Sequence, residues 1–236
     1  KKTKILLKYF LKEKFDFKYL PVDISENVLL QLAESLKEEL PELEVEIFPG
    51  NYAKVLKQLT NYKKRKKVIL FLGSNIGNFK KEEAVTFLQS IAGAMEKEDL
   101  LFVGFDQKKD PQIIRNAYND EAGITEAFNK NLLKRINREM DADFDPENFI
   151  HWPIYNPETG TVKSFLVSKK EQIVNIKALD VKVNFKIWES IHTENSQKFD
   201  EDSVEELSAS AGLQILDYFA DEKSWYRNYI FKKKEL

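Results

Sequence analysis

Polar side chains that can bind a nucleoside follow two apolar stretches near the start of the sequence. Asp23 ends the stretch YLPVD, and Asn51 and Tyr52 follow the stretch EIFPG. A carboxylate at the carboxyl end of a parallel strand typically accepts hydrogen bonds from ribose hydroxyls. The Asn51 amide can pair with an adenine edge, and the Tyr52 ring can stack on the base. Structural roles compete with binding, because Asp23 could cap a helix beside Ser25, and Asn51 and Tyr52 could form a simple turn.

The loop FLGSNIGNF, residues 71–79, places two of the chain's 8 glycines four residues apart, where an apolar strand should end. Ligands of doubly wound α/β domains bind beyond the carboxyl ends of the strands. Asn75 and Asn78 can each donate and accept hydrogen bonds, and Gly73 and Gly77 would let a polar ligand approach the backbone. The alternative is that Asn78 caps a helix that begins near Lys80.

Two segments of the carboxyl-terminal half also carry polar residues in unusual numbers. The stretch from Asn116 to Asn131 contains four asparagines, which are mediocre helix formers and therefore indicate capping or a site. The segment WESIHTENSQKF includes Glu189, Glu194 and Ser196. A carboxylate there could receive the ammonium group of a ligand, or the segment could be a solvated edge strand.

Composition excludes several classes of function. The 236 residues include 37 Lys+Arg and 39 Asp+Glu, so the net charge of -2 disfavours nucleic acid as the main partner. There is no cysteine, and the two histidines do not form a zinc motif, so we expect no disulfide and no metal. No apolar run reaches the roughly 18–20 residues of a membrane span. The default compartment is the cytoplasm, and the oligomeric state is open.

The first hundred residues predict an α/β fold. Helical periodicity in KKTKILLKYFLKEKF places Ile5, Leu6, Tyr9 and Phe10 on one face. Strands ending at Asp23 and near Gly50 alternate with helices, as do the apolar segments KVILFLG and DLLFVGFD, which are typical of strands buried on both faces of a parallel sheet. This rhythm predicts a doubly wound sheet.

The rhythm changes after Asp110. Two predicted helices are followed by alternating, hairpin-like strands up to residue 185, and the tail returns to a helix and an antiparallel strand pair. We therefore predict a core of residues 1–108 and 199–236, with residues 109–198 inserted as a substrate-binding α+β subdomain.

Taken in order, six segments resemble the histidine-specific methyltransferases. They are YLPVDIS, FPGNY, FLGSNIGNF, the stretch 104–145, FIHW and ESIHTENSQKF. The resemblance covers nearly the whole chain. It implies a Rossmann-like class I methyltransferase sheet and the cofactor S-adenosylmethionine (SAM), which in this family methylates the α-amino group of L-histidine three times on the route to ergothioneine.

The resemblance also assigns residues to the two ligands. For the cofactor, Asp23 matches the ribose-binding acid, Asn51 and Tyr52 match the pair beside the adenine, and Lys2 matches a lysine that follows the glycine-rich loop. The residues that it implies for the amino acid substrate are the following. Asn78 and Tyr118 match residues that hold the substrate backbone, Glu194 and Ser196 match the pair that reads its side chain, and Ser164 lies where a methionine walls the imidazole pocket.

The sequence departs from the family pattern at several places. Asn51 stands where aspartate is preferred, Lys163 where glutamate is usual and Ser164 where methionine is usual. The family's glycine-rich loop, its strand and an amino-terminal helical segment would stand before Lys1. That strand would lie between the strands ending at Asp23 and Gly73, so we expect a preceding segment or a rearranged sheet, and little SAM binding by these 236 residues alone.

The predicted function is therefore SAM-dependent N-methylation of the α-amino group of histidine or a related amino acid. Catalysis would consist mainly of positioning the amine lone pair about 3–3.5 Å from the methyl carbon, with Tyr118 or a water relaying the amine proton. One alternative is a catalytically inactive family member that binds a ligand or partner. A second is an oxidoreductase, which would need a GxGxxG loop that the sequence does not show.

Overall fold

The computed structural model describes residues 2–59 and 65–234, which fold as two compact units. The first unit comprises Lys1–Lys66 with Gly93–Glu96, and the second comprises Lys67–Ala92 with Lys97–Leu236. Each unit has its own sheets and its own buried apolar cluster.

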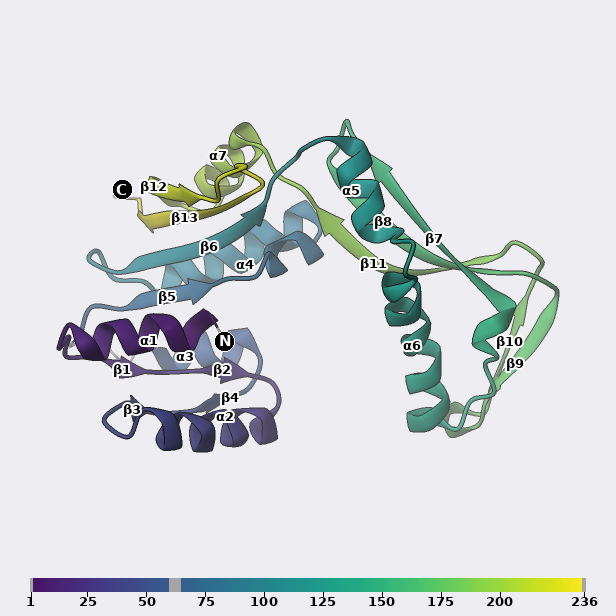
Figure 1. Ribbon diagram of the computed structural model, residues 1–236, viewed down its shortest axis with the longest axis horizontal. Helices are drawn as coiled ribbons and strands as arrows, with labels where there is room; N and C mark the ends of the chain where they lie inside the picture. Colours follow the sequence, from purple (N-terminus) through teal and green to yellow (C-terminus); the bar gives the residue numbers. More distant parts are fainter. Residues whose placement is uncertain (1, 60–64, 235–236) are drawn as a thin grey trace. The chain divides into compact units, whose positions relative to one another are not determined.

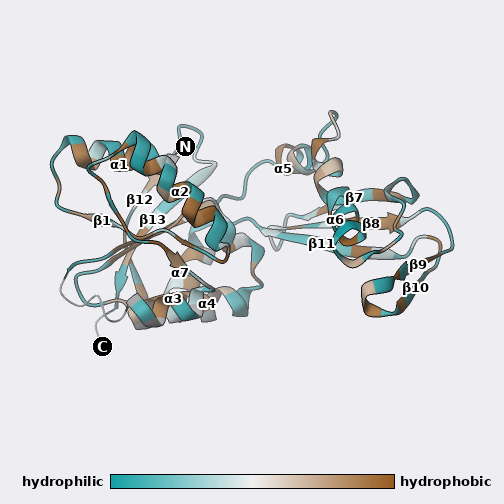
Figure 2. Cartoon of the chain, turned by 90° about the horizontal axis from the view of Figure 1, so that it is seen from below, coloured by the Kyte–Doolittle hydropathy of each residue, from teal (hydrophilic) through white to brown (hydrophobic). Residues whose placement is uncertain are grey.

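Among its described residues, the first unit contains two short parallel strand pairs and three complete helices (Figure 1). Leu7, Leu36, Leu40 and Leu43 form its buried cluster. Figure 2 shows hydrophobic and hydrophilic residues on different sides of α1 and α2, as expected for helices with one buried face. The elements are α1 (Lys2–Lys12), β1 (Lys18–Tyr19), β2 (Val22–Asp23), α2 (Glu26–Glu39), β3 (Glu44–Val45), β4 (Phe48–Pro49) and α3 (Tyr52–Leu59).

The second unit is built on a four-stranded sheet in the order β12-β13-β6-β5. Strand β5 runs parallel to β6, and β13 pairs antiparallel with both β6 and β12. Leu101, Val103 and Phe105 of β6 are completely buried, so this strand forms the centre of the core. The elements of this part are β5 (Val68–Phe71), η1 (Asn75–Asn78), α4 (Lys81–Ala94), β6 (Leu100–Asp106), α7 (Glu201–Ser210), β12 (Leu213–Ala220) and β13 (Tyr226–Lys233).

A second antiparallel sheet, in the order β11-β8-β7, lies between β6 and α7 in the sequence and is accompanied by two helices and a hairpin. Leu133, Phe149, Leu166 and Phe185 belong to its buried cluster. The elements are α5 (Pro111–Tyr118), α6 (Ile124–Met140), η2 (Pro146–Asn148), β7 (Phe149–Asn156), β8 (Thr161–Ser168), β9 (Gln172–Ile176), η3 (Lys177–Leu179), β10 (Val181–Phe185) and β11 (Ser190–Gln197).

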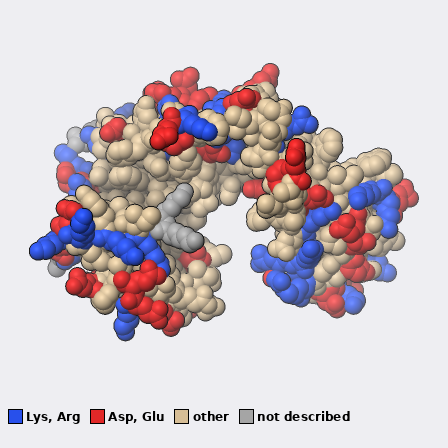
Figure 3. All heavy atoms as spheres, viewed as in Figure 1, with Lys and Arg blue, Asp and Glu red and all other residues tan. Residues whose placement is uncertain are grey.

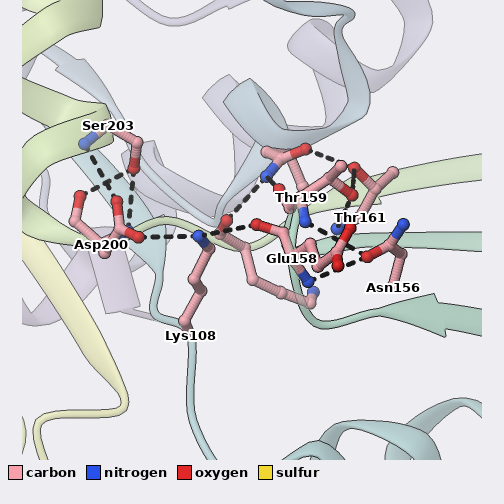
Figure 4. Close-up of polar contacts among 9 residues, drawn as sticks. Lys108, Asn156, Glu158, Thr159, Thr161, Asp200 and Ser203 are labelled. Atoms are coloured by element: carbon pink, nitrogen blue, oxygen red, sulfur yellow. Dashed lines mark hydrogen bonds and ion pairs between the residues drawn. The ribbon is translucent and has the colours of Figure 1, made fainter.

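An ion pair and a helix cap lie where two chain segments connect these sheets (Figure 4). The Lys108 ammonium nitrogen lies 2.7 Å from Asp200 Oδ2. Asp200 in turn caps α7 by accepting a hydrogen bond from the backbone N–H of Ser203 at 3.0 Å. The end of β6 also pairs with the segment that follows β11, because the Phe199 N–H donates to the Asp106 carbonyl at 2.9 Å.

The predicted α/β class is confirmed, but two details are wrong. Strand β5 is not buried on both faces: Val68 is 52% exposed, because β5 pairs only with β6 among the described strands. In α1, Ile5 and Tyr9 are exposed, and the buried side chain is that of Leu7. The division into a core and an insert at residues 109–198 stays a prediction.

Acidic and basic side chains are interspersed on the face shown in Figure 3. Within residues 2–59 and 65–234, no helix combines the length and apolar character that a bilayer crossing requires. In the same part of the chain, His, Asp and Glu side chains form no group that could hold a metal ion.

Candidate active site

The predicted cofactor residues Asp23 and Asn51 lie at neighbouring strand ends in the first unit. Strands β2 and β4 are parallel and pair Asp23 with Pro49, and the Gly50 N–H donates to the Asp23 carbonyl at 2.9 Å. Asp23 Oδ1 accepts a hydrogen bond from the Ser25 N–H at 2.8 Å, and Asn51 Oδ1 accepts one from the Lys54 N–H at 3.0 Å. Asp23 thus forms a turn with Ser25, which is itself the N-cap of α2, and Asn51 caps the first turn of α3. These bonds engage one of the two Asp23 carboxylate oxygens and the single side-chain oxygen of Asn51.

Of the other two predicted cofactor residues, the structure describes the side chain of one. Tyr52 begins α3 and is 45% exposed, so its ring is accessible. Lys2 begins α1, but its side chain lies outside the described residues.

The loop after β5 is held in an unusual backbone conformation. Ser74 adopts φ 63°, in the left-handed region that a residue other than glycine rarely occupies. Its Oγ accepts a hydrogen bond from the Asp106 N–H at 3.2 Å, and the Gly73 N–H donates to the Tyr226 hydroxyl at 3.0 Å. These two bonds fasten the loop to β6 and β13.

Gly77 allows the same loop to touch the backbone of β11. A Cβ atom added at Gly77 would lie 2.7 Å from the carbonyl oxygen of Gln197, which is closer than real Cβ contacts. Its neighbour Asn78 is exposed, and the Asn78 side chain makes no hydrogen bond to another described residue. The cap of α4 is supplied instead by Glu83, whose Oε2 accepts from the Lys80 N–H at 2.9 Å. The side chain of Asn78 is thus available to a ligand.

A buried lysine that the sequence did not single out lies beside this contact. Lys198 follows β11, and its side chain is only 3% exposed. Its ammonium nitrogen lies 2.8 Å from Asp106 Oδ2, at the carboxyl end of β6. Asp106 Oδ1 is paired with Lys109, so each carboxylate oxygen has a cationic partner.

The same ammonium group connects two predicted substrate residues. Lys198 Nζ donates to the Tyr118 hydroxyl at 2.7 Å and to Ser196 Oγ at 2.8 Å, and it lies 4.8 Å from the centre of the Tyr118 ring. Burial lowers the pKa of Lys198, but Tyr118 and Asp106 oppose this effect and raise that pKa above its ordinary value. Lys198 is therefore charged at neutral pH.

Strand register places Ser164 beside Glu194, and both residues are predicted to lie at the side chain of the substrate. Ser164 pairs with Glu194 and Val162 pairs with Ser196, so these side chains share one face of the sheet. Ser164 is 1% exposed, and its Oγ has no hydrogen-bond partner among the described residues. A buried hydroxyl without a partner is costly, which favours a ligand group at this position.

The asparagines of the segment 116–131 prove to have structural roles at two positions. Asn129 is buried; its Oδ1 accepts from Thr193 Oγ1 at 2.6 Å, and its amide donates to the Thr125 carbonyl at 3.0 Å. It therefore ties α6 to β11, one residue before Glu194. Asn116 Oδ1 accepts a hydrogen bond from Gln112 Nε2 at 2.6 Å.

The structure thus brings Tyr118 and Ser196 together at Lys198, and Ser164 and Glu194 together by register. Asp23 and Asn51 form a separate group in the first unit. Two residues of this cluster, Asp106 and Lys198, were not predicted from the sequence. The strand-end rule that selected Asp23 would also have selected Asp106, whereas one lysine among 37 basic residues carries no signal.

Residues 1–233 match a family described as histidine-specific, SAM-dependent methyltransferases. The chain belongs to this family. The predicted family is therefore confirmed, with its SAM-dependent methyltransferase class.

Individual relatives agree with that assignment. The histidine N-alpha-methyltransferase of Mycolicibacterium smegmatis is 32% identical over 93% of this chain, and that of Mycobacterium tuberculosis is 34% identical over 87%. The chain spans 68% and 63% of the length of these two relatives, about two thirds. An L-tryptophan methyltransferase from Psilocybe serbica is 32% identical over 67% of the chain and 44% of its own length.

Proposed function

We propose that this protein transfers a methyl group from SAM to the α-amino group of histidine or a related amino acid. The observation that carries the proposal is the family match over residues 1–233, together with the buried lysine that joins Tyr118 and Ser196. The matched relatives are named as enzymes, which favours catalysis over an inactive binding protein.

The strand ends of the first unit fit the nucleoside part of SAM. Asp23 accepts one backbone hydrogen bond with Oδ1, and its other oxygen is suited to the ribose hydroxyls. Asn51 stands where its amide can meet an adenine edge, without the charge assistance of an aspartate. Tyr52 is exposed and can stack on the base, and Lys2 is retained as a cofactor residue on the resemblance alone.

The second unit would hold the acceptor amino acid. Asn78 and Tyr118 are proposed to bind the substrate amino and carboxylate groups, and Glu194, Ser196 and Ser164 to contact its side chain. Glu194 is a carboxylate on the same face of the sheet as Ser164, whose buried hydroxyl lacks a partner among the residues described. A side chain with polar hydrogen-bonding atoms, such as imidazole, would satisfy both groups.

The chemistry asks little of the protein beyond placement. When bound, SAM supplies an electrophilic methyl group. The residues around Tyr118 must hold the neutral amine in line with it, and fixing this geometry can supply several kcal/mol of the barrier. The amine also loses a proton, which Tyr118 or a water molecule would accept. The site we propose lies in the cytoplasm, where SAM is available.

Titration and turnover of the full-length protein test this function. SAM should bind in a calorimeter, and a panel of amino acids that includes L-histidine and L-tryptophan should yield an N-methylated product with at least one member. L-tryptophan is included because one relative carries that substrate in its name. SAM binding without methylation of any amino acid would favour the inactive alternative.

A further inference from the structure

We infer that Lys198 is a positioning residue that fixes the hydroxyl groups of Tyr118 and Ser196 as hydrogen-bond donors toward the amino acid substrate. The inference rests on the proposed function and deepens it, because it assigns a direction to the hydrogen bonds of the proposed site.

An ammonium group has three N–H donors and no acceptor. Lys198 Nζ has three oxygen neighbours within 2.8 Å, which are Asp106 Oδ2, Tyr118 Oη and Ser196 Oγ. Each N–H therefore has one partner, and both hydroxyl oxygens act as acceptors toward the lysine. The hydroxyl protons of Tyr118 and Ser196 must then point elsewhere.

Asp106 keeps the lysine charged and in place. The Asp106 side chain is 25% exposed, whereas the Lys198 side chain is 3% exposed, so the cation is removed from solvent and has the carboxylate as its charged partner. A charged donor makes a hydrogen bond shorter and about twice as strong as a neutral one. The preference for this hydroxyl orientation is accordingly strong.

The orientation determines which substrate groups fit. The Tyr118 hydroxyl is a donor for the substrate carboxylate, and the Ser196 hydroxyl is a donor for an acceptor atom, such as the unprotonated nitrogen of an imidazole ring. Because its proton is committed to the carboxylate, Tyr118 is then a binding group, and the proton of the amine passes to water.

Matched pairs of amino acids and decarboxylated amines test the inference. We compare L-histidine with histamine and L-tryptophan with tryptamine by calorimetry on the full-length protein with SAM present. The wild type should bind the acid of a pair more tightly than the amine. Lys198→Met should reduce that preference about tenfold to a hundredfold, the range for a hydrogen bond to a charged group. A merely structural role would weaken both members equally and leave the ratio unchanged, which would overturn the inference.

Lys109→Met is the matched control. Lys109 pairs with the other oxygen of Asp106 and with the Trp225 carbonyl, but it contacts neither hydroxyl. Its removal should leave the preference for the acid within about twofold of the wild type. If Lys109→Met lowers the preference as much as Lys198→Met does, the effect arises from Asp106 and the inference is wrong.

Two further measurements cover the cases in which the first comparison fails. The first replaces Lys198→Met if that protein is unstable, and the second needs no bound amino acid. Lys198→Arg keeps the cation beside Asp106, but a planar guanidinium cannot reproduce the three contacts, so a folded Lys198→Arg protein should still lose most of the preference. Without any ligand, Tyr118→Phe should lower the Tm of the wild type and leave that of the Lys198→Met background nearly unchanged.

An equal loss of Tm in both backgrounds would show that the Lys198–Tyr118 contact is absent. A wild type that binds SAM but neither acid would contradict the proposed function, and the ligand-free comparison would still decide whether Lys198 orients Tyr118.

Discussion

Strand ends in the two units satisfy their polar side chains in different ways. In the first unit, Asp23 accepts from the Ser25 N–H and Asn51 from the Lys54 N–H, so each side chain has a backbone partner two or three residues away. In the second unit, Asp106 pairs with Lys198, which follows β11 and lies 92 positions further along the chain. The first arrangement is local, whereas the second involves a buried lysine and depends on the tertiary fold.

The two proposed sites should therefore respond differently to mutation. A side chain that bonds only to nearby backbone can be replaced without disturbing the fold beyond one helix end. A buried lysine that contacts three side chains transmits a change at one of them to the others. Mutations can test this contrast, and the largest effect is expected at the cofactor site.

Asp23→Ala should weaken SAM binding at least tenfold. Loss of a charged acceptor for ribose hydroxyls costs about 1.5–3 kcal/mol, and the affinity falls tenfold for every 1.4 kcal/mol. Calorimetry on the full-length protein measures this change, with amino acid binding as the control. An unchanged SAM affinity would remove Asp23 from the cofactor site and leave it only its turn-forming bond to Ser25.

Gly77→Ala should disturb the second unit although it removes no polar group. The added Cβ would lie 2.7 Å from the Gln197 carbonyl, between Ser196 and Lys198 in sequence, so the backbone must move. Overpacking of this kind costs about 1–3 kcal/mol of unfolding free energy. Chemical denaturation should show that loss, and turnover should fall with it. Gly93→Ala is the control, because a Cβ there would meet no atom within 4 Å.

Tyr118→Phe and Asn78→Ala should each lower turnover about tenfold and leave SAM affinity near that of the wild type. Each removes one hydrogen bond to the acceptor amino acid, a loss of about 1–1.5 kcal/mol, and neither residue belongs to the cofactor group. Steady-state kinetics and calorimetry separate the two effects. If both variants fold but no longer bind SAM, the proposed division between cofactor and substrate residues is wrong.

Asp200→Asn should have the smallest effect, and that effect should depend on pH. Lys108 and Ser203 hold the pKa of Asp200 at about 2, below its ordinary value of 3.8. A lowered pKa stabilises the folded state above the unfolded pKa, and this contribution disappears as the pH falls from about 4 to about 2. The side chain is 43% exposed, so the loss at pH 7 should stay below about 1 kcal/mol. Denaturation of both proteins at pH 7 and near pH 3 measures the difference, and a difference that grows on acidification would contradict the assigned ion pair.

The sequence predicted what local rules determine. Ser25 caps α2 as expected, and the alternation of strands and helices is present through β6, because turn chemistry and periodicity act over a few residues. The exposure of Val68, Ile5 and Tyr9 could not be predicted, since it depends on which strands and helices become neighbours.

The candidate site shows the same limit more sharply. Tyr118, Ser164, Glu194 and Ser196 were chosen through family resemblance, and their motifs are long enough to carry that assignment. Lys198 remained invisible because its importance comes from contacts with Asp106 and Tyr118, which the fold alone brings within 2.8 Å. A lysine of this kind cannot be told from a solvated one by its sequence neighbours.

The central claim is that the protein methylates the α-amino group of an amino acid. It is tested most directly by incubating the full-length protein with SAM carrying an isotopically labelled methyl group and with L-histidine, and by locating the label by NMR. The account predicts label on the α-nitrogen, formed about tenfold more slowly by the Tyr118→Phe protein. Label on the imidazole ring, or no labelled product although both SAM and L-histidine bind, would contradict it.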